Sequence, residues 1–168
     1  MHIRKYLEEH SYMHAFQGAG WEMSEFHDGY LQKQLLDAVS SEIPIYIWDS
    51  SLHMAWVNSK ALELAGITRD TPNPENGIIV KDDMGEPAGT LIDMATKTVE
   101  NALPPLSVSE KKALLLAFQN LEHSLGVTGH MCAFIEPHSV DYTAYRELIA
   151  EGKLKMYTQL AFYMSPET

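Results

Sequence analysis

Cysteine is almost missing from this sequence of 168 residues, which contains Cys132 and no other. A single cysteine excludes a disulfide within the chain and is typical of a reducing compartment, so we expect a cytoplasmic protein. Long apolar runs are also missing. The longest, at 113–118 and 131–135, are much shorter than the roughly 20 residues that a membrane-spanning helix needs. We therefore expect no membrane partner.

Positive charge is scarce, because 12 basic side chains stand against 23 acidic ones and give a formal net charge of −11. The acidic residues are scattered along the chain, which is typical of a solvated surface, and no basic stripe alternates with aromatic residues. Such a surface repels phosphate backbones, so we expect no nucleic-acid partner. With 45% hydrophobic and 21% charged residues, the composition is that of an ordinary globular protein.

The first half of the chain alternates between helix-like and strand-like patterns. Apolar spacing predicts helices over 3–10 and 29–39 and strands over 13–18 and 44–48. Asn58 is placed to cap a helix that runs through Leu64 and is closed by Gly66.

The middle of the chain predicts a β-hairpin, because two apolar segments, 78–81 and 89–92, flank the turn-rich residues 82–87. The two prolines at 72 and 74 exclude a helix just before it. We expect this hairpin to be a small insertion that lies outside the main layers of the fold.

The second half has the clearest pattern. Ser107 and Glu110 form a capping box that begins a helix, and Gly126 stands where that helix should end. The helix carries one apolar face, formed by Leu114, Leu115, Phe118, Leu121 and Leu125. A strand over 127–135, a helix over 142–150 and a strand over 154–164 follow. Strand, helix and strand in this order predict an α/β fold with parallel strands.

Residues 53–62, which read His-Met-Ala-Trp-Val-Asn-Ser-Lys-Ala-Leu, and Ala-Gly-Ile-Thr at 65–68 resemble the amidohydrolase 3 family. This family of metal-dependent hydrolases includes the N-substituted formamide deformylase-like enzymes. Further similar segments occur in family order. They are at 18–21, 36–39, 71–74, 77–80, 85–91 and 125–128. Each segment alone has low specificity, but together they cover nearly the whole chain.

The resemblance implies a (β/α)8 TIM barrel with one or two divalent metal ions, zinc in particular, at the carboxyl ends of the strands. The implied ligands are a His-x-His pair, a lysine, two later histidines and an aspartate. The eight histidines here include no His-x-His, and the resemblance places the chain between the first strand and the later ligands. We therefore expect one incomplete catalytic domain. It would have barrel strands and helices over 1–70 and 93–168, a hairpin insertion over 71–92, and neither a metal site nor a catalytic residue of its own.

Strand ends aim side chains into the active site of a barrel enzyme, which makes His53 and Trp21 the candidate substrate-binding residues. A neutral imidazole at His53 can donate a hydrogen bond toward a polarised carbonyl; the alternative is a histidine that is hydrogen-bonded within its loop. Trp21 either packs within its loop or forms a wall of the substrate pocket. Glu136 and His138 follow the strand 127–135, and whether Glu136 faces the active site stays open because residues 129–132 depart from the family pattern.

The function that we expect is therefore that of a segment of a metal-dependent amidohydrolase acting on a small-molecule amide or formamide, inactive when alone. In the complete enzyme a metal-bound hydroxide would attack the carbonyl group. The alternative is a non-catalytic module, a partial barrel that forms a homo-oligomer through unpaired strand edges and an exposed apolar face.

Overall fold

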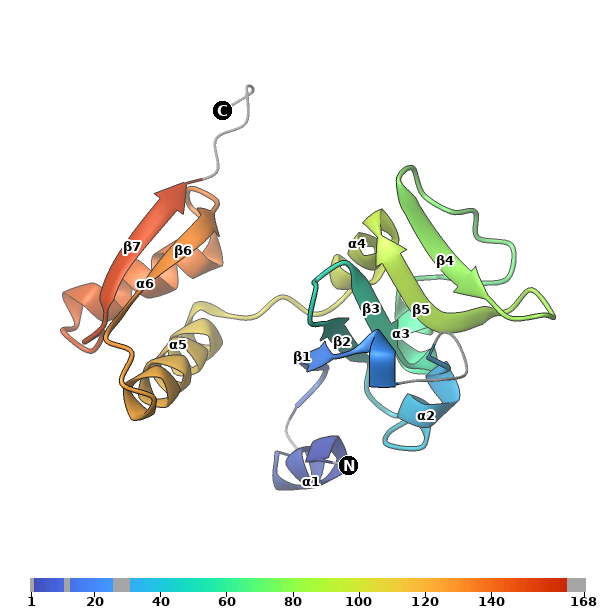
Figure 1. Ribbon diagram of the computed structural model, residues 1–168, viewed down its shortest axis with the longest axis horizontal. Helices are drawn as coiled ribbons and strands as arrows, with labels where there is room; N and C mark the ends of the chain where they lie inside the picture. Colours follow the sequence, from blue (N-terminus) through green and yellow to red (C-terminus); the bar gives the residue numbers. More distant parts are fainter. Residues whose placement is uncertain (1, 11–12, 26–30, 163–168) are drawn as a thin grey trace. The chain divides into compact units, whose positions relative to one another are not determined.

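The computed structural model describes residues 2–10, 13–25 and 31–162 (Figure 1). The predicted helix over 29–39 begins outside these residues, and the predicted strand over 154–164 ends outside them. Contacts between residues divide the chain into two compact units, residues 1–104 and residues 105–168.

The first unit is built around one five-stranded sheet with the strand order β1-β2-β3-β5-β4 (Figure 1). Its elements are α1 (His2–Glu9), β1 (Phe16–Trp21), the 3-10 helix η1 (Met23–Glu25), α2 (Lys33–Asp37), β2 (Ile45–Asp49), β3 (Met54–Val57), α3 (Ser59–Leu64), β4 (Gly77–Lys81), β5 (Pro87–Asp93) and α4 (Met94–Glu100). Strands β1 and β2 are parallel, and the other three neighbouring pairs are antiparallel. The parallel arrangement expected of a barrel thus holds for one pair of this sheet.

The β-hairpin is confirmed as β4 and β5, which pair in the antiparallel direction. It does not lie outside the main layers, because β5 also pairs with β3, where Met54 stands opposite Ile92. The hairpin therefore extends the sheet that begins with β1 and β2. The linking strand β3 was not predicted, since its four residues, 54–57, are too few to show an alternating pattern.

The inner strands β2, β3 and β5 bury side chains on both faces of the sheet. Successive side chains of a strand point to opposite faces, so each strand contributes to both sides. Tyr46 and Val57 lie in one core cluster together with residues of α3 and α4. Ile45, Ile47 and Trp56 lie in a second cluster that includes Leu36 of α2. Helices therefore cover both sides of the strands.

Asn58 is the N-cap of α3, as predicted, and it is completely buried. Its Oδ1 accepts hydrogen bonds from the backbone N–H groups of Ala61 and Ile45, both at 2.9 Å. Its Nδ2 donates to the carbonyl oxygens of Ser40 and Ile43, also at 2.9 Å. One side chain thus joins the start of α3, the start of β2 and the loop before β2.

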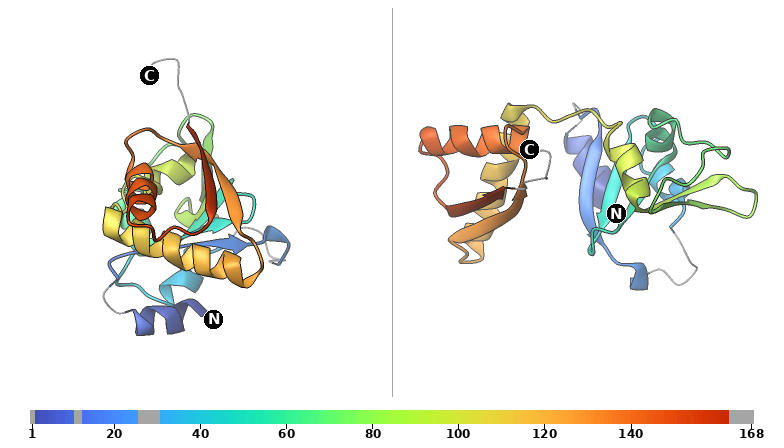
Figure 2. Two further views of the ribbon diagram at one scale, coloured as in Figure 1. Left: turned by 90° about the vertical axis from the view of Figure 1, so that its left-hand side faces the viewer. Right: turned by 90° about the horizontal axis from the view of Figure 1, so that it is seen from above.

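The second unit contains α5 (Val108–Ser124), β6 (Gly129–Ile135), α6 (Val140–Ala150) and β7 (Tyr157–Phe162). The predicted strand–helix–strand motif is confirmed, because β6 and β7 pair in parallel and α6 connects them. Helix α5 packs against α6 (Figure 2). The Tyr145 hydroxyl of α6 lies 3.2 Å from Nε2 of His130 in β6. The predicted capping box of Ser107 and Glu110 is present at the start of α5. The protein therefore has a mixed α/β fold.

The predicted apolar face of α5 is largely exposed, with exposed fractions of 53% for Leu114, 58% for Leu121 and 70% for Leu125. The residue of α5 that is buried is Gln119, which is only 6% exposed. Its Oε1 accepts the backbone N–H of Lys155 at 2.6 Å and so fixes the segment that leads into β7. Among the described helices, none has the length and apolar character required to cross a membrane.

Candidate functional site

The carboxyl ends of β1 and β2 meet at one edge of the first sheet because the two strands are parallel, with Trp21 opposite Asp49. Strand β3 runs in the opposite direction, so His53, which precedes it, lies at the same edge. Strand β5 is antiparallel to β3 and ends there with Asp93, whose backbone N–H donates to the carbonyl oxygen of His53 at 2.8 Å. We call these four residues, Trp21, Asp49, His53 and Asp93, the strand-end cluster.

Asp49 organises the turn that presents His53. Its Oδ1 accepts the backbone N–H groups of His53 at 3.0 Å and Met54 at 2.8 Å, and its Oδ2 accepts the N–H of Ser51 at 3.2 Å. Burial alone would raise the pKa of Asp49, which is 4% exposed. The hydrogen bonds from the Ser51 hydroxyl and from these backbone N–H groups outweigh burial and lower the pKa below its ordinary value. Asp49 therefore stays ionised at neutral pH and holds the turn.

His53 is paired with a carboxylate that lies forty positions further along the chain. Its Nδ1 lies 2.8 Å from Oδ1 of Asp93, and the two side chains are 74% and 52% exposed. The imidazole is thus held on one side and open to solvent on the other. This ring can contact a small molecule at the edge of the sheet.

Asp93 has an unusual backbone for an aspartate, with φ 49° and ψ −124°. It is the N-cap residue of α4, a position where an aspartate normally accepts a hydrogen bond from the first turn of the helix. Here its carboxylate makes no such bond in the described structure and is directed to His53 instead. Non-glycine residues in this backbone region are strained, and such strain is concentrated at functional sites.

Trp21 lies within the core rather than in an open pocket. It is 7% exposed, its ring packs in the cluster that contains Ile45 and Trp56, and its Nε1 donates to the carbonyl oxygen of Ile47 at 3.0 Å. The indole therefore supports the strand-end cluster by packing.

Glu136 and His138 lie in the second unit, just after β6, and both are exposed. His138, with φ 66°, lines a shallow pocket of about 240 Å³ together with Pro137, Tyr142 and Phe162. The three rings are arranged edge to face, with 6.5 Å between the centroids of His138 and Tyr142 and 5.5 Å between those of Tyr142 and Phe162. This pocket lies at the carboxyl ends of β6 and β7, where parallel α/β folds bind ligands, and Glu136 does not line it.

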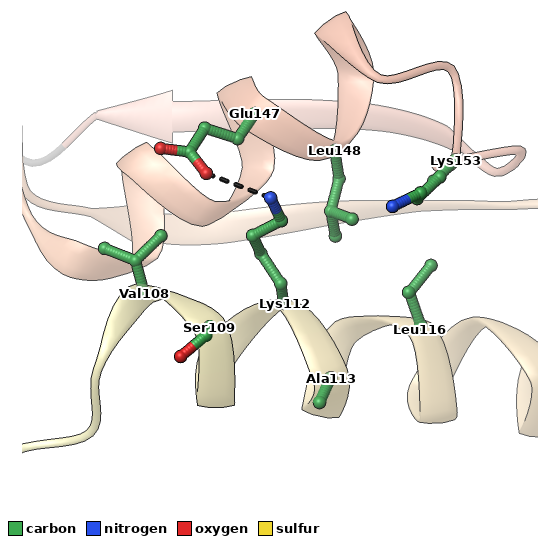
Figure 3. A pocket seen from close by; sticks show the side chains of 8 residues that line it. All are labelled: Val108, Ser109, Lys112, Ala113, Leu116, Glu147, Leu148 and Lys153. Atoms are coloured by element: carbon green, nitrogen blue, oxygen red, sulfur yellow. Dashed lines mark hydrogen bonds and ion pairs between the residues drawn. The ribbon is translucent and has the colours of Figure 1, made fainter.

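A larger groove of about 480 Å³ lies between α5 and α6. Figure 3 shows Lys112 reaching from α5 toward Glu147 of α6, with 3.0 Å between Nζ and the carboxylate. Lys112 also pairs with Glu151, which pairs with Lys153 at 2.9 Å. Hydrogen bonds to Glu151 and Glu147 raise the pKa of Lys112. Because these charges are paired with one another, and the groove lies near the amino-terminal end of β7, we assign it to helix packing.

The residues that the structure describes do not form a metal site. Within 2–10, 13–25 and 31–162, no group of three or more histidine, cysteine, aspartate or glutamate side chains could hold a metal ion. In the strand-end cluster both carboxylate oxygens of Asp49 already accept hydrogen bonds from N–H groups. This leaves His53 and Asp93 as the side chains that could bind a metal ion. Two ligands are fewer than an ordinary zinc site has.

Asp49 and Asp93 were not predicted as site residues from the sequence, although each one ends an apolar strand. Strand ends that carry an acidic residue are a usable signal for a site. The pairing of Asp93 with His53 depends on how β3 and β5 align, and β3 is too short to be predicted.

Comparison with known proteins gives consistent matches. Residues 3–163 match the family model described as "Amidohydrolase family". The chain is 36% identical over 140 residues to a protein named amidohydrolase YtcJ of Bacillus subtilis, covering 81% of this chain and 26% of that protein. It is 31% identical over 144 residues to N-substituted formamide deformylase of Arthrobacter pascens, covering 80% of this chain and 26% of that enzyme. The chain thus spans about a quarter of the length of these relatives.

The fold is similar to that of a solved metal-dependent hydrolase from Pyrococcus horikoshii, with a TM-score of 0.61 and 22% identity over 92% of this chain and 29% of that one. A second metal-dependent hydrolase, from Pyrococcus furiosus, gives a TM-score of 0.58 at 22% identity, covering 95% of this chain and 32% of that one. The family model covers nearly all of the sequence, and two relatives more than 30% identical agree with it. The chain therefore belongs to the amidohydrolase family.

Proposed function

We propose that this chain forms part of the barrel wall of a metal-dependent amidohydrolase that hydrolyses C–N bonds in small amide- or formamide-like substrates. The observation that carries the proposal is the His53–Asp93 pair, which stands at the edge where the parallel strands β1 and β2 end. In barrel enzymes this edge faces the substrate. His53 would contact the substrate, and Trp21 would shape the site by packing behind it.

The divalent metal of the complete enzyme, expected to be zinc, would be held by residues other than those described here, since the described side chains do not fit a metal site. What this chain supplies is substrate positioning. We therefore expect the 168 residues alone to be inactive toward amides, and we expect the cytoplasm as the location because Cys132 is the single cysteine.

Two measurements test the proposal. The purified chain, incubated with Zn²⁺ and then desalted, should retain less than one zinc ion per molecule and should not hydrolyse an N-substituted formamide. Stoichiometric zinc with turnover would show that these residues form a complete site.

The positive arm is a segment exchange. The aligned 80% of this chain would replace the matching segment of N-substituted formamide deformylase, and the exchanged enzyme should hydrolyse its formamide in a metal-dependent way. His53→Gln in that enzyme should lower kcat/KM by about 10- to 100-fold, in the range expected for loss of one positioned polar contact. Lys60→Gln, at a half-exposed position on α3 where the side chain pairs with Glu63, is the matched control and should leave kcat/KM unchanged. Equal activity of the His53→Gln variant and its parent would refute the role of His53.

A second candidate function, a non-catalytic module that self-associates, is favoured by the exposed apolar face of α5. Phe118, at 40% exposed, lies on it together with Leu114, Leu121 and Leu125. In the described chain β6 and β7 pair only with each other, and unpaired edges and apolar faces both promote association. Light scattering after size exclusion should then give a dimer that Leu121→Glu converts to monomer; a monomer at all concentrations would exclude this candidate.

A further inference from the structure

We infer that Asp93 fixes the tautomer of His53, so that the neutral imidazole presents Nε2 to the substrate as a hydrogen-bond acceptor. Asp93 is thus a positioning residue, which acts through His53 and does not touch the substrate. The statement about the substrate rests on the proposed function, whereas the statement about the tautomer does not.

The 2.8 Å separation between Nδ1 of His53 and Oδ1 of Asp93 determines where the ring proton lies. An ionised carboxylate can only accept hydrogen bonds, so Nδ1 must carry the hydrogen of this bond. A neutral imidazole has a single N–H group, and Nε2 is then left with a lone pair. Unlike the donor role expected from the sequence, the geometry gives the neutral ring an acceptor role on its exposed side.

The pair is restrained from several directions, which separates it from a chance contact between two exposed side chains. The carboxylate of Asp49 holds the backbone N–H groups of His53 and Met54, which fixes the turn. The backbone N–H of Asp93 donates to the carbonyl oxygen of His53 at 2.8 Å, so the two residues are joined by main chain as well as by side chain. Asp93 also has a backbone φ of 49°, and its carboxylate bonds to the imidazole of His53 and does not cap α4.

An acceptor at Nε2 selects for a hydrogen-bond donor on the substrate. A secondary amide or an N-monosubstituted formamide carries such a donor in its N–H group, and an N,N-disubstituted analogue does not. We therefore expect the site to prefer substrates that retain an N–H, because a polar group built to pair with a donor discriminates strongly against an analogue that lacks it.

The tautomer can be measured on the 168-residue protein without any activity. In ¹⁵N-labelled protein, two-bond proton–nitrogen correlations of the imidazoles give separate nitrogen shifts for Nδ1 and Nε2, and a pH series locates the neutral form. His53→Gln assigns the signals. We expect Nδ1 to show the shift of a protonated nitrogen and Nε2 that of an unprotonated one, the reverse of the tautomer that predominates in free histidine.

Asp93→Gly removes the carboxylate and also tolerates the positive φ, so it should not strain the fold. In this variant we expect His53 to return to the Nε2–H tautomer. Asp93→Asn, which keeps the size of the side chain, should give a mixture because its amide can either accept or donate. Asp83→Gly, at an exposed position in the turn of the hairpin, is the matched loss of charge and should leave the shifts of His53 unchanged.

Two results would overturn the inference: an Nε2–H tautomer in the unmodified protein, or an Nδ1–H tautomer that persists in Asp93→Gly. The substrate arm uses the exchanged enzyme, in which a secondary formamide should exceed its N,N-disubstituted analogue in kcat/KM by at least about 10-fold. Asp93→Gly should abolish this preference; an unchanged preference would refute the acceptor role. If the tautomer is as inferred and the exchanged enzyme has no metal-dependent turnover, the proposed function fails while the role of Asp93 stands.

Discussion

Replacing Asn58 by alanine should destabilise the first unit more than most single substitutions would. The side chain is completely buried and makes four hydrogen bonds of 2.9 Å. Alanine makes none of them. The loss therefore combines a helix cap with the link between α3, β2 and the preceding loop.

The magnitude follows from the groups that are left without partners. Loss of the cap on the Ala61 N–H costs about 1 kcal/mol. The N–H of Ile45, which lies in the core, loses its acceptor, and an unsatisfied buried donor costs about 1–3 kcal/mol. The carbonyl groups of Ser40 and Ile43 are only partly buried and can bond to water, so they add little. Together we expect a loss of about 2–4 kcal/mol, a large part of the roughly 5–15 kcal/mol of a typical domain.

Urea unfolding followed by tryptophan fluorescence measures this loss in the right unit. All three tryptophans, Trp21, Trp48 and Trp56, lie between residues 1 and 104. With a denaturant slope of about 1–2 kcal/mol per molar, the midpoint should fall by about 2 M. Asn58→Ser can still cap α3 and should recover about 1 kcal/mol of the loss. Asn101→Ala, at an exposed position, is the control and should change stability by less than about 0.5 kcal/mol.

A loss of less than about 1 kcal/mol in the free energy of unfolding of Asn58→Ala would refute this magnitude. Only the cap would then be energetically relevant, and the N–H of Ile45 would have found another acceptor. An equal loss in Asn58→Ser and Asn58→Ala would likewise show that the cap itself contributes nothing.

Three further predictions concern single residues. Folding lowers the pKa of Asp49, so the ionised carboxylate stabilises the folded protein at pH values above its unfolded pKa of about 3.9. This stabilisation is lost as the pH falls through the folded pKa. The urea midpoint should therefore fall less between about pH 5 and pH 3 in Asp49→Asn than in the unmodified protein. Gln119→Leu removes the acceptor of the Lys155 N–H. Hydrogen exchange at that amide should accelerate by about 10-fold or more, which corresponds to a loss of about 1.4 kcal/mol or more of local stability. Unchanged exchange would contradict the contact. Gly89 has φ 111°, and a Cβ there would lie 2.8 Å from the carbonyl oxygen of Val57. Gly89→Ala should therefore lower the free energy of unfolding by about 2 kcal/mol or more. A urea midpoint equal to that of the unmodified protein would show that β5 can move away from Val57 without loss of stability.

Much of the fold was predictable because its signals are local. The cap at Asn58 and the capping box at Ser107 each involve residues only three positions apart, so the spacing alone predicts the start of α3 and of α5. Gly66 and Gly126 have positive φ where the sequence predicted the ends of these helices. The parallel pair of β6 and β7 follows from two apolar strands separated by a helix.

The candidate site was only half predictable. His53 was identified from its motif and lies at the strand edge, but neither its partner Asp93 nor the turn-holding role of Asp49 was predicted. Helix α5 shows a similar limit, since its apolar stripe is exposed and the polar Gln119 is buried. A hydrogen-bond partner such as the Lys155 N–H is supplied by a distant segment and leaves no mark on the helix itself.

The sequence by itself determined where helices begin and end, the hairpin of β4 and β5, and the family to which the chain belongs. All three depend on contacts or motifs within a few residues of one another. The tertiary structure alone decided that the hairpin joins the main sheet through β3, and that His53 meets Asp93. The physical reason is that pairing between strands is fixed by register over long separations, and a strand of four residues carries too little pattern to specify its neighbours.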